Sequence, residues 1–62
     1  MSKQLKVGGK FTVAKGTRIY TQGLQMSQQR TRDITIRALE ATRDGKTRVV
    51  WKSMGHRTTT VV

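Results

Sequence analysis

Short stretches of alternating apolar and polar residues, separated by glycines, constrain the fold of this chain more than any other feature of its sequence. Phe11 and Val13 alternate with polar residues in Lys10–Ala14, and Ile19 is the apolar centre of Thr17–Thr21. β-Branched residues also dominate two later stretches, Thr47–Lys52 and Arg57–Val62. A period of two with β-branched and aromatic residues is typical of strands that bury one face. Because proline is absent, the sequence predicts several short strands.

The chain is short and has no cysteine, which limits how its fold can be stabilised. A domain of 62 residues buries only about 60% of the surface that its unfolded chain exposes. Disulfides are excluded, and the single histidine, His56, has no partner at metal-ligand spacing. We therefore expect one domain over residues 1–62, with an economical core, no metal site and a frayed start at residues 1–4.

Gln22–Arg32 interrupts the strand pattern. It contains four glutamines, and Leu24 and Met26 are its only large apolar residues. We expect a long connection here, a kind of segment that frequently carries binding sites.

Asp33–Thr42 admits two interpretations. Its first half alternates as in a strand, whereas Ala38-Leu39-Glu40-Ala41 has helix-forming composition and Asp33 would cap a helix. The Asp44-Gly45 pair that follows favours the strand, because Asp-Gly between two periodic runs predicts a hairpin with a type I′ turn. The register expected for this hairpin places Arg43 opposite Lys46, Leu39 opposite Val50 and Ala38 opposite Trp51.

The alternation also predicts which residues are buried. The expected core consists of Val7, Phe11, Val13, Ile19, Ile34, Ile36, Val49, Trp51 and Val61. Leu39 and Val50 fall on the opposite face of the hairpin, so we expect an exposed apolar pair there. A homodimer would cover that pair and gain stability with concentration.

The expected order of strands, a long loop followed by two short hairpins at Asp44-Gly45 and Gly55, resembles that of the SH3-like small barrels. This group includes Tudor-like and KOW-like modules. Lys6–Val13 together with Val49-Val50-Trp51-Lys52 is also similar to small accessory proteins of bacteriophages. The resemblance spans most of the chain and implies an all-β fold, a small SH3-like barrel of about five antiparallel strands with a long first loop and two tight hairpins. The aromatic groove with which signalling SH3 domains bind proline-rich peptides is not matched.

The charge of the chain indicates its class of partner. Thirteen Lys and Arg residues face only three carboxylates, which gives a formal net charge of +10. A soluble surface without a target usually mixes both signs. A positive potential over such a small domain is relieved by a polyanion, and nucleic acid is the partner that we expect.

The candidate nucleic-acid-binding residues are cations expected on outward strand positions, at the hairpin tip and in the long loop, together with one aromatic side chain. They are Lys10, Arg18, Tyr20, Arg30, Arg32, Arg37, Arg43, Lys46, Arg48, Lys52 and Arg57. Arginine suits phosphate because its planar fork donates two hydrogen bonds. Tyr20 is expected to face outward beside Arg18, where a base of a single strand would stack on it.

Other function classes find little support in the sequence. Asp33, Glu40 and His56 are too few for general acid–base catalysis, and neither GxSxG nor a phosphate-binding glycine loop is present. We expect no enzymatic activity and no cofactor. No signal peptide or apolar stretch of membrane-spanning length is present, so we expect a cytoplasmic protein without a membrane partner. The alternative function is that of a small interaction protein, of the kind phages encode, that binds an acidic surface of a host protein and modulates it, because charge complementarity supports this equally well.

Overall fold

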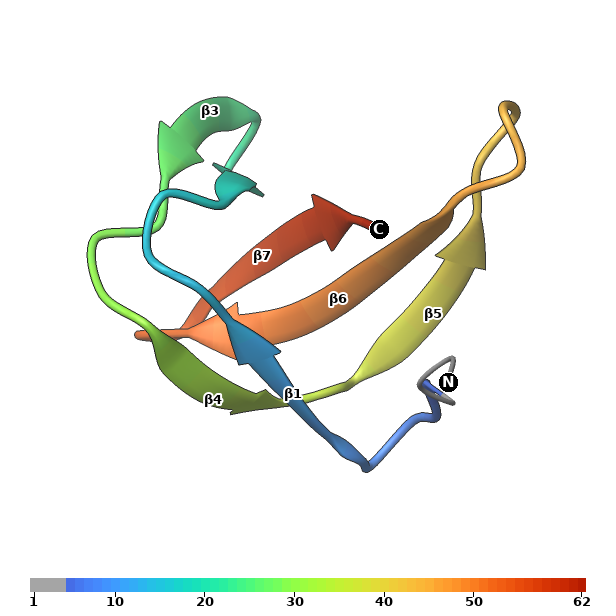
Figure 1. Ribbon diagram of the computed structural model, residues 1–62, viewed down its shortest axis with the longest axis horizontal. Coiled ribbons are helices and arrows are strands. Elements are labelled where there is room, and N and C mark those ends of the chain that lie inside the picture. Colours follow the sequence, from blue (N-terminus) through green and yellow to red (C-terminus); the bar gives the residue numbers. More distant parts are fainter. Residues whose placement is uncertain (1–4) are drawn as a thin grey trace.

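The fold consists of β-strands arranged in two antiparallel sheets. The computed structural model describes residues 5–62, so the frayed start expected at residues 1–4 lies outside the described residues. Strands β1 (Lys10–Val13) and β4 (Arg32–Thr35) form a two-stranded sheet. The other sheet has the order β3-β2-β7-β6-β5 and consists of β2 (Arg18–Thr21), β3 (Leu24–Ser27), β5 (Ala38–Ala41), β6 (Thr47–Ser53) and β7 (His56–Val61) (Figure 1). The all-β prediction is confirmed, and residues 5–62 contain no helix.

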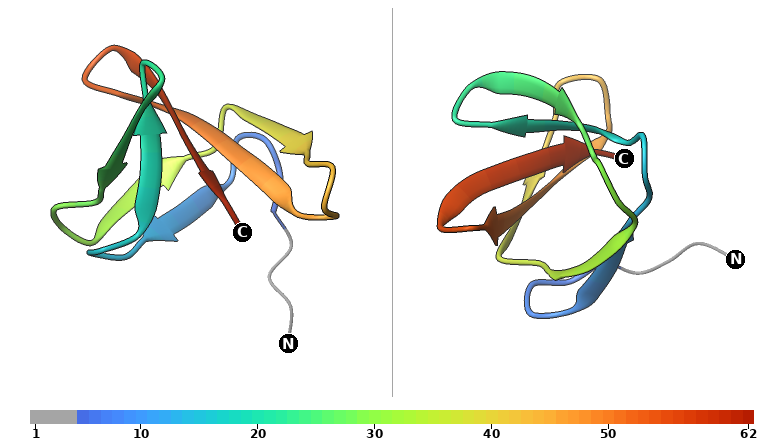
Figure 2. Two further views of the ribbon diagram at one scale, coloured as in Figure 1. Left: turned by 90° about the horizontal axis from the view of Figure 1, so that it is seen from above. Right: turned by 90° about the vertical axis from the view of Figure 1, so that its left-hand side faces the viewer.

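The chain passes between the two sheets at sharp bends. Residues 14–17 join β1 to β2 and residues 28–31 join β3 to β4, and the Gln28 N–H donates to the Thr17 carbonyl (2.8 Å) between them. A second crossing follows β4, where the Ile36 N–H donates to Gly9 (2.9 Å) and the Arg37 N–H donates to Val50 in β6 (2.7 Å). The two sheets therefore curve around a common core (Figure 2). Asp33–Thr42 is extended rather than helical, as the Asp-Gly pair indicated, but it forms two strands instead of one.

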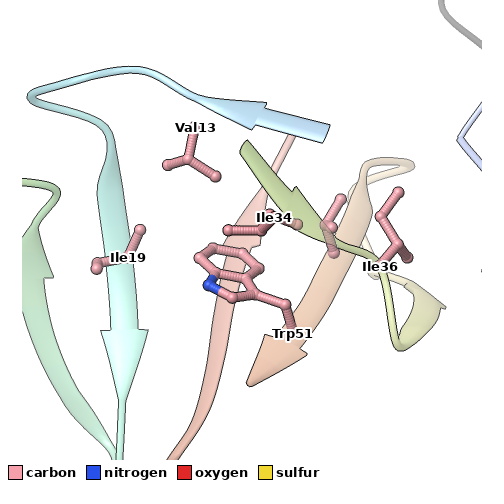
Figure 3. Close-up of a cluster of buried hydrophobic side chains, with 6 residues drawn as sticks. Val13, Ile19, Ile34, Ile36 and Trp51 are labelled. Carbon is pink, nitrogen blue, oxygen red and sulfur yellow. The ribbon is translucent and has the colours of Figure 1, made fainter. Parts of the chain in front are cut away.

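The core lies between the sheets. Trp51 on β6 is 3% exposed, and its ring lies among Val13, Ile19 and Ile34 from three other strands (Figure 3). The expected core residues that are buried are Val13, Ile19, Ile34, Ile36, Val49 and Trp51. Phe11 is partly buried against this cluster, as are Leu5 and Leu39.

The prediction that Val7 and Val61 belong to the core is wrong, because their side chains are 60% and 38% exposed. Val61 faces outward because its strand directs Thr58 and Thr60 inward, where both are 1% exposed. The buried hydroxyls are paired: the Thr58 and Thr21 Oγ1 atoms are 3.2 Å apart, and Thr60 donates to a backbone carbonyl. Thr58 and Thr60 therefore fill the part of the core that Val61 was expected to fill. Val7 lies in the turn that the Gly9 N–H closes on the Lys6 carbonyl (3.0 Å), outside the strands.

The hairpin at Asp44-Gly45 is present, but its predicted register is wrong by one residue. Ala38 lies opposite Val50 and Leu39 opposite Val49. The reason is the turn, in which only Gly45 has a positive φ (83°), whereas a type I′ turn needs two such residues.

Thr42 closes a longer loop, because its hydroxyl accepts a hydrogen bond from the Lys46 N–H (2.9 Å) and its backbone N–H donates to the Lys46 carbonyl (2.9 Å). A slip of one residue moves every side chain to the other face. Leu39 therefore packs against the core, and Val50 is only 5% exposed. The exposed Leu39–Val50 pair, on which the expected homodimer rested, is wrong.

The long loop expected at Gln22–Arg32 is also wrong, since this segment contains β3. Gln22 and Gly23 both have positive φ (53° and 79°) and connect Thr21 directly to Leu24. Two such residues form the two-residue turn that matches the twist of a hairpin. The turn at Met54-Gly55 has the same form, with φ of 53° and 82°, and confirms the tight connection expected there.

Candidate nucleic-acid interface

A hollow between the two sheets brings three of the expected cations together. β5 pairs with β6 only as far as Val50, because the chain turns away into the other sheet at Arg37. The end of β6 is thus left without a neighbour on this side, and a hollow of about 430 Å³ opens between it and β4. Arg32 from β4, Arg37 from the crossing and Lys52 from β6 line it.

A second hollow of about 350 Å³ adjoins the first, and Arg32, Ser53 and Met54 line both. It lies against the inward face of the β2–β3 hairpin, where the lining is largely apolar and includes Ile19 and Met26. Its remaining lining is polar or charged and includes Gln28, Gln29, Arg30 and His56. We call the two hollows together the basic groove, with Arg30, Arg32, Arg37 and Lys52 as its cations.

No carboxylate lies within 4.0 Å of any of these four cations in the part of the chain that the structure describes. Asp33 also lines the groove, but its carboxylate accepts a hydrogen bond from the Thr12 hydroxyl (2.6 Å). The basic groove therefore carries positive charge that the protein itself does not neutralise by ion pairing.

The outer face of the five-stranded sheet holds a second group of expected residues. Tyr20 is 38% exposed and points away from the core, because its neighbour Ile19 points inward. It lines one shallow hollow with Arg18 and Lys46 and another with Arg57. The outward orientation expected for Tyr20 beside Arg18 is thus confirmed.

Part of this outer charge is neutralised within the sheet. Glu40 on β5 binds Arg48 through Oε1 (3.1 Å) and Arg57 through Oε2 (3.2 Å). Arg48 and Arg57 are therefore less available to an anion than the cations of the basic groove.

Lys10 and Arg43 lie apart from both groups. Lys10 donates to Thr35 (3.3 Å) on the two-stranded sheet, and Arg43 is exposed in the loop between β5 and β6. Lys46 also belongs to this loop and lies 4.0 Å from Asp44. A hydrogen bond donated by the Thr42 hydroxyl is the main cause that lowers the pKa of the Asp44 carboxyl.

The apolar part of the basic groove was not predicted from the sequence. Met26 is 48% exposed and Met54 is 90% exposed. The signal for Met26 was present, because Leu24–Ser27 alternates after the Gln22-Gly23 turn. His56 is the first residue of β7, and its Nδ1 is hydrogen-bonded to the Gln22 side chain, which links the tip of the β2–β3 hairpin to the β6–β7 turn.

Comparison with protein-family models, with curated proteins and with solved structures finds no match to this chain. Among residues 5–62 there is no helix long and apolar enough to cross a membrane.

Proposed function

We propose that this protein is a non-enzymatic nucleic-acid-binding protein that contacts phosphates with a basic surface and has little sequence specificity. The observation that carries the proposal is the basic groove, whose two adjoining hollows are lined by four cations, none of which forms an ion pair with a carboxylate within residues 5–62. Cations in this arrangement favour a ligand that bears several negative charges along its length.

The chemistry of the groove cations fits phosphate. Arg32 and Arg37 offer planar forks that donate paired hydrogen bonds to phosphate oxygens, and Lys52 adds a mobile point charge. Binding by phosphate neutralisation releases condensed counterions, so affinity from this source falls steeply with salt. The net charge of +10 adds long-range attraction for the same ligand.

Low sequence specificity follows from what the groove lacks. Sequence is read by side chains that bond base edges in a duplex groove, and such readers usually sit on a protruding helix or ribbon. Here the cations line a depression. Contacts to the phosphate backbone position a nucleic acid without reading its sequence.

We also propose the SH3-like barrel as the architecture. The support is the path of the chain after β4: residues 36 and 37 lead from β4 of one sheet directly into β5 of the other, so this extended segment contributes a strand to both sheets. An experimental structure of this protein tests the proposal, because superposition on SH3-like barrels should show the same path of the chain.

The function is tested by equilibrium binding of the wild-type chain to a labelled oligonucleotide over a range of salt concentrations. We expect log K to fall linearly with log salt, with a slope of about −0.9 per phosphate contacted on duplex DNA and about −0.7 on single strands. Absence of binding to DNA and RNA even at about 50 mM salt contradicts the proposal. The alternative partner, an acidic surface of another protein, then accounts better for the same charge.

A further inference from the structure

We infer that the preferred ligand of the basic groove is single-stranded nucleic acid, with an unstacked base held against Met26 and Met54. This inference rests on the proposed function and names its substrate class. It starts from the difference between the two halves of the groove, one charged and one largely apolar.

The apolar half is an uncovered part of the inner face of the five-stranded sheet. β3 forms the edge of that sheet, and the two-stranded sheet covers the core side of β2 but leaves β3 exposed along its whole length. Met26, which lies opposite the buried Ile19 in the hairpin, is consequently 48% exposed while Ile19 is 8% exposed. The surface around Met26 therefore has apolar character and no partner within the described residues.

The chemistry of this hollow suits a flat heterocycle. Met26 and Met54 offer thioethers, which make favourable contacts with aromatic rings. Gln28 and Gln29 offer amides that both donate and accept hydrogen bonds, as the edge of a base requires. The hollow has a volume of about 350 Å³, at the small end of the range of about 300–1,000 Å³ that ligand sites show.

The groove cations lie beside the apolar hollow, where the phosphate backbone of a bound single strand would lie. Arg30 and Arg32 line the same hollow as the methionines, and Arg32 continues into the half with Arg37 and Lys52. The Gln28 side chain donates to the Arg30 carbonyl (2.7 Å) and so holds the connection between β3 and β4 in place. A ligand with an apolar ring beside a chain of negative charges matches both halves at once.

Duplex DNA cannot use the apolar half, because its bases are stacked inside the helix. A protein that binds by phosphate contacts alone favours the duplex, whose charge density is higher. Tighter binding of a single strand than of a duplex is thus evidence for contacts to the bases. We expect these contacts to accept any of the four bases, because every base has a π-face.

The test measures binding of four chains to three probes by fluorescence anisotropy. The chains are the wild type, Met26→Ala, Met54→Ala and the matched control Leu24→Ala. Leu24 shares β3 and its inward face with Met26 and is 66% exposed, but it does not line the hollow. The probes are a single-stranded oligothymidylate, an abasic strand of equal length and a duplex of equal length.

We expect the wild type to bind the oligothymidylate more tightly than the duplex or the abasic strand at about 0.15 M salt. Each methionine variant should weaken oligothymidylate binding about two- to tenfold and leave the salt slope, duplex binding and abasic binding unchanged. Leu24→Ala should bind as the wild type does. Since neither methionine belongs to the buried core, circular dichroism and thermal melting should show the variants folded.

The outcomes separate this inference from the proposed function. Equal binding of the single strand, the abasic strand and the duplex overturns the inference and leaves nucleic-acid binding intact. Equal weakening by Met26→Ala and Leu24→Ala overturns it as well. Binding to none of the three probes overturns the proposed function itself.

Discussion

Replacement of Glu40 by glutamine should destabilise the fold although Glu40 is on the surface. Its carboxylate holds two arginines, Arg48 at 3.1 Å and Arg57 at 3.2 Å, across three neighbouring strands. Because Arg57 lies opposite Lys52 and Glu40 lies opposite Arg48, the Arg57–Glu40 pair passes over the outer side of Val50. Val50 is only 5% exposed at this position, which agrees with cover by a long charged side chain.

The size of the expected loss of stability follows from the solvent exposure of the two ion pairs. The Glu40 side chain is 40% exposed and those of Arg48 and Arg57 are 42% and 63% exposed, so solvent screens both ion pairs. Pairs of this kind each contribute about 0.2–1 kcal/mol. We expect Glu40→Gln to lower the free energy of unfolding by about 1 kcal/mol, which for a domain of this size lowers the melting temperature by about 4–8 °C.

Thermal melting followed by circular dichroism measures the effect, and Asp33→Asn is its control. Asp33→Asn makes the same change of net charge, from +10 to +11, but Asp33 has no ion pair within 4.0 Å in the described residues. Its hydrogen bond from Thr12 survives in the amide. The destabilisation by Glu40→Gln should exceed that of the control and should shrink at about 1 M salt. Equal losses in the two variants, or a loss that salt leaves unchanged, would show that the two ion pairs of Glu40 do not stabilise the fold.

Three other substitutions test local features of the fold. Thr60→Val removes the hydroxyl that donates to the Arg18 carbonyl (2.7 Å) and should lower the free energy of unfolding by about 1 kcal/mol in urea denaturation; an unchanged midpoint contradicts the contribution of that bond. Met54→Asn should raise the melting temperature, because Met54 has a φ of 53° before Gly55 and Asn-Gly is the preferred pair for such a turn; a lower melting temperature contradicts this account of the turn. The pKa of the Asp44 carboxyl is lowered by the hydrogen bond from Thr42, so the carboxylate stabilises the fold at neutral pH and loses this effect as the pH falls through its folded pKa. Melting curves of the wild type and Asp44→Asn should therefore differ at neutral pH and converge in acid, and a difference that persists in acid contradicts the assignment.

Strand patterning predicted the fold class and most of the core, because successive side chains of a strand point to opposite faces of the sheet and every second residue faces the core. Val13, Ile34 and Trp51 are buried as this rule requires. The rule failed for β7, where Thr58 and Thr60 occupy the inner positions and Val61 lies outside. Hydrophobicity alone could not decide the phase of that strand, since the threonine hydroxyls find partners in the folded chain.

Turn geometry limited the remaining predictions. Positive φ at Gln22, a residue without a strong preference for it, created a hairpin where polarity indicated a loop. In the Thr42–Lys46 loop, hydrogen bonds of Thr42 set the register of the hairpin. The candidate site depends on the β2–β3 hairpin and on the pairing of β5 with β6, because the inner face of β3 and the unpaired end of β6 form the basic groove. The sequence indicated the cations of the groove, but their gathering in one place depends on the crossing at Arg37.

Phosphate contact by the cations of the basic groove underlies the proposed function, and the salt dependence of binding measures it. Arg37→Gln combined with Lys52→Gln neutralises two groove cations, and Lys6→Gln combined with Lys15→Gln neutralises two exposed cations that do not line the groove. Both double variants carry the same net charge, lower by two than the +10 of the wild type. On a single strand, the groove variant should flatten the slope of log K against log salt by about 1.4, which is 0.7 for each lost phosphate contact, and the control should keep the wild-type slope. Equal slopes in the two double variants would show that the groove cations do not contact phosphates.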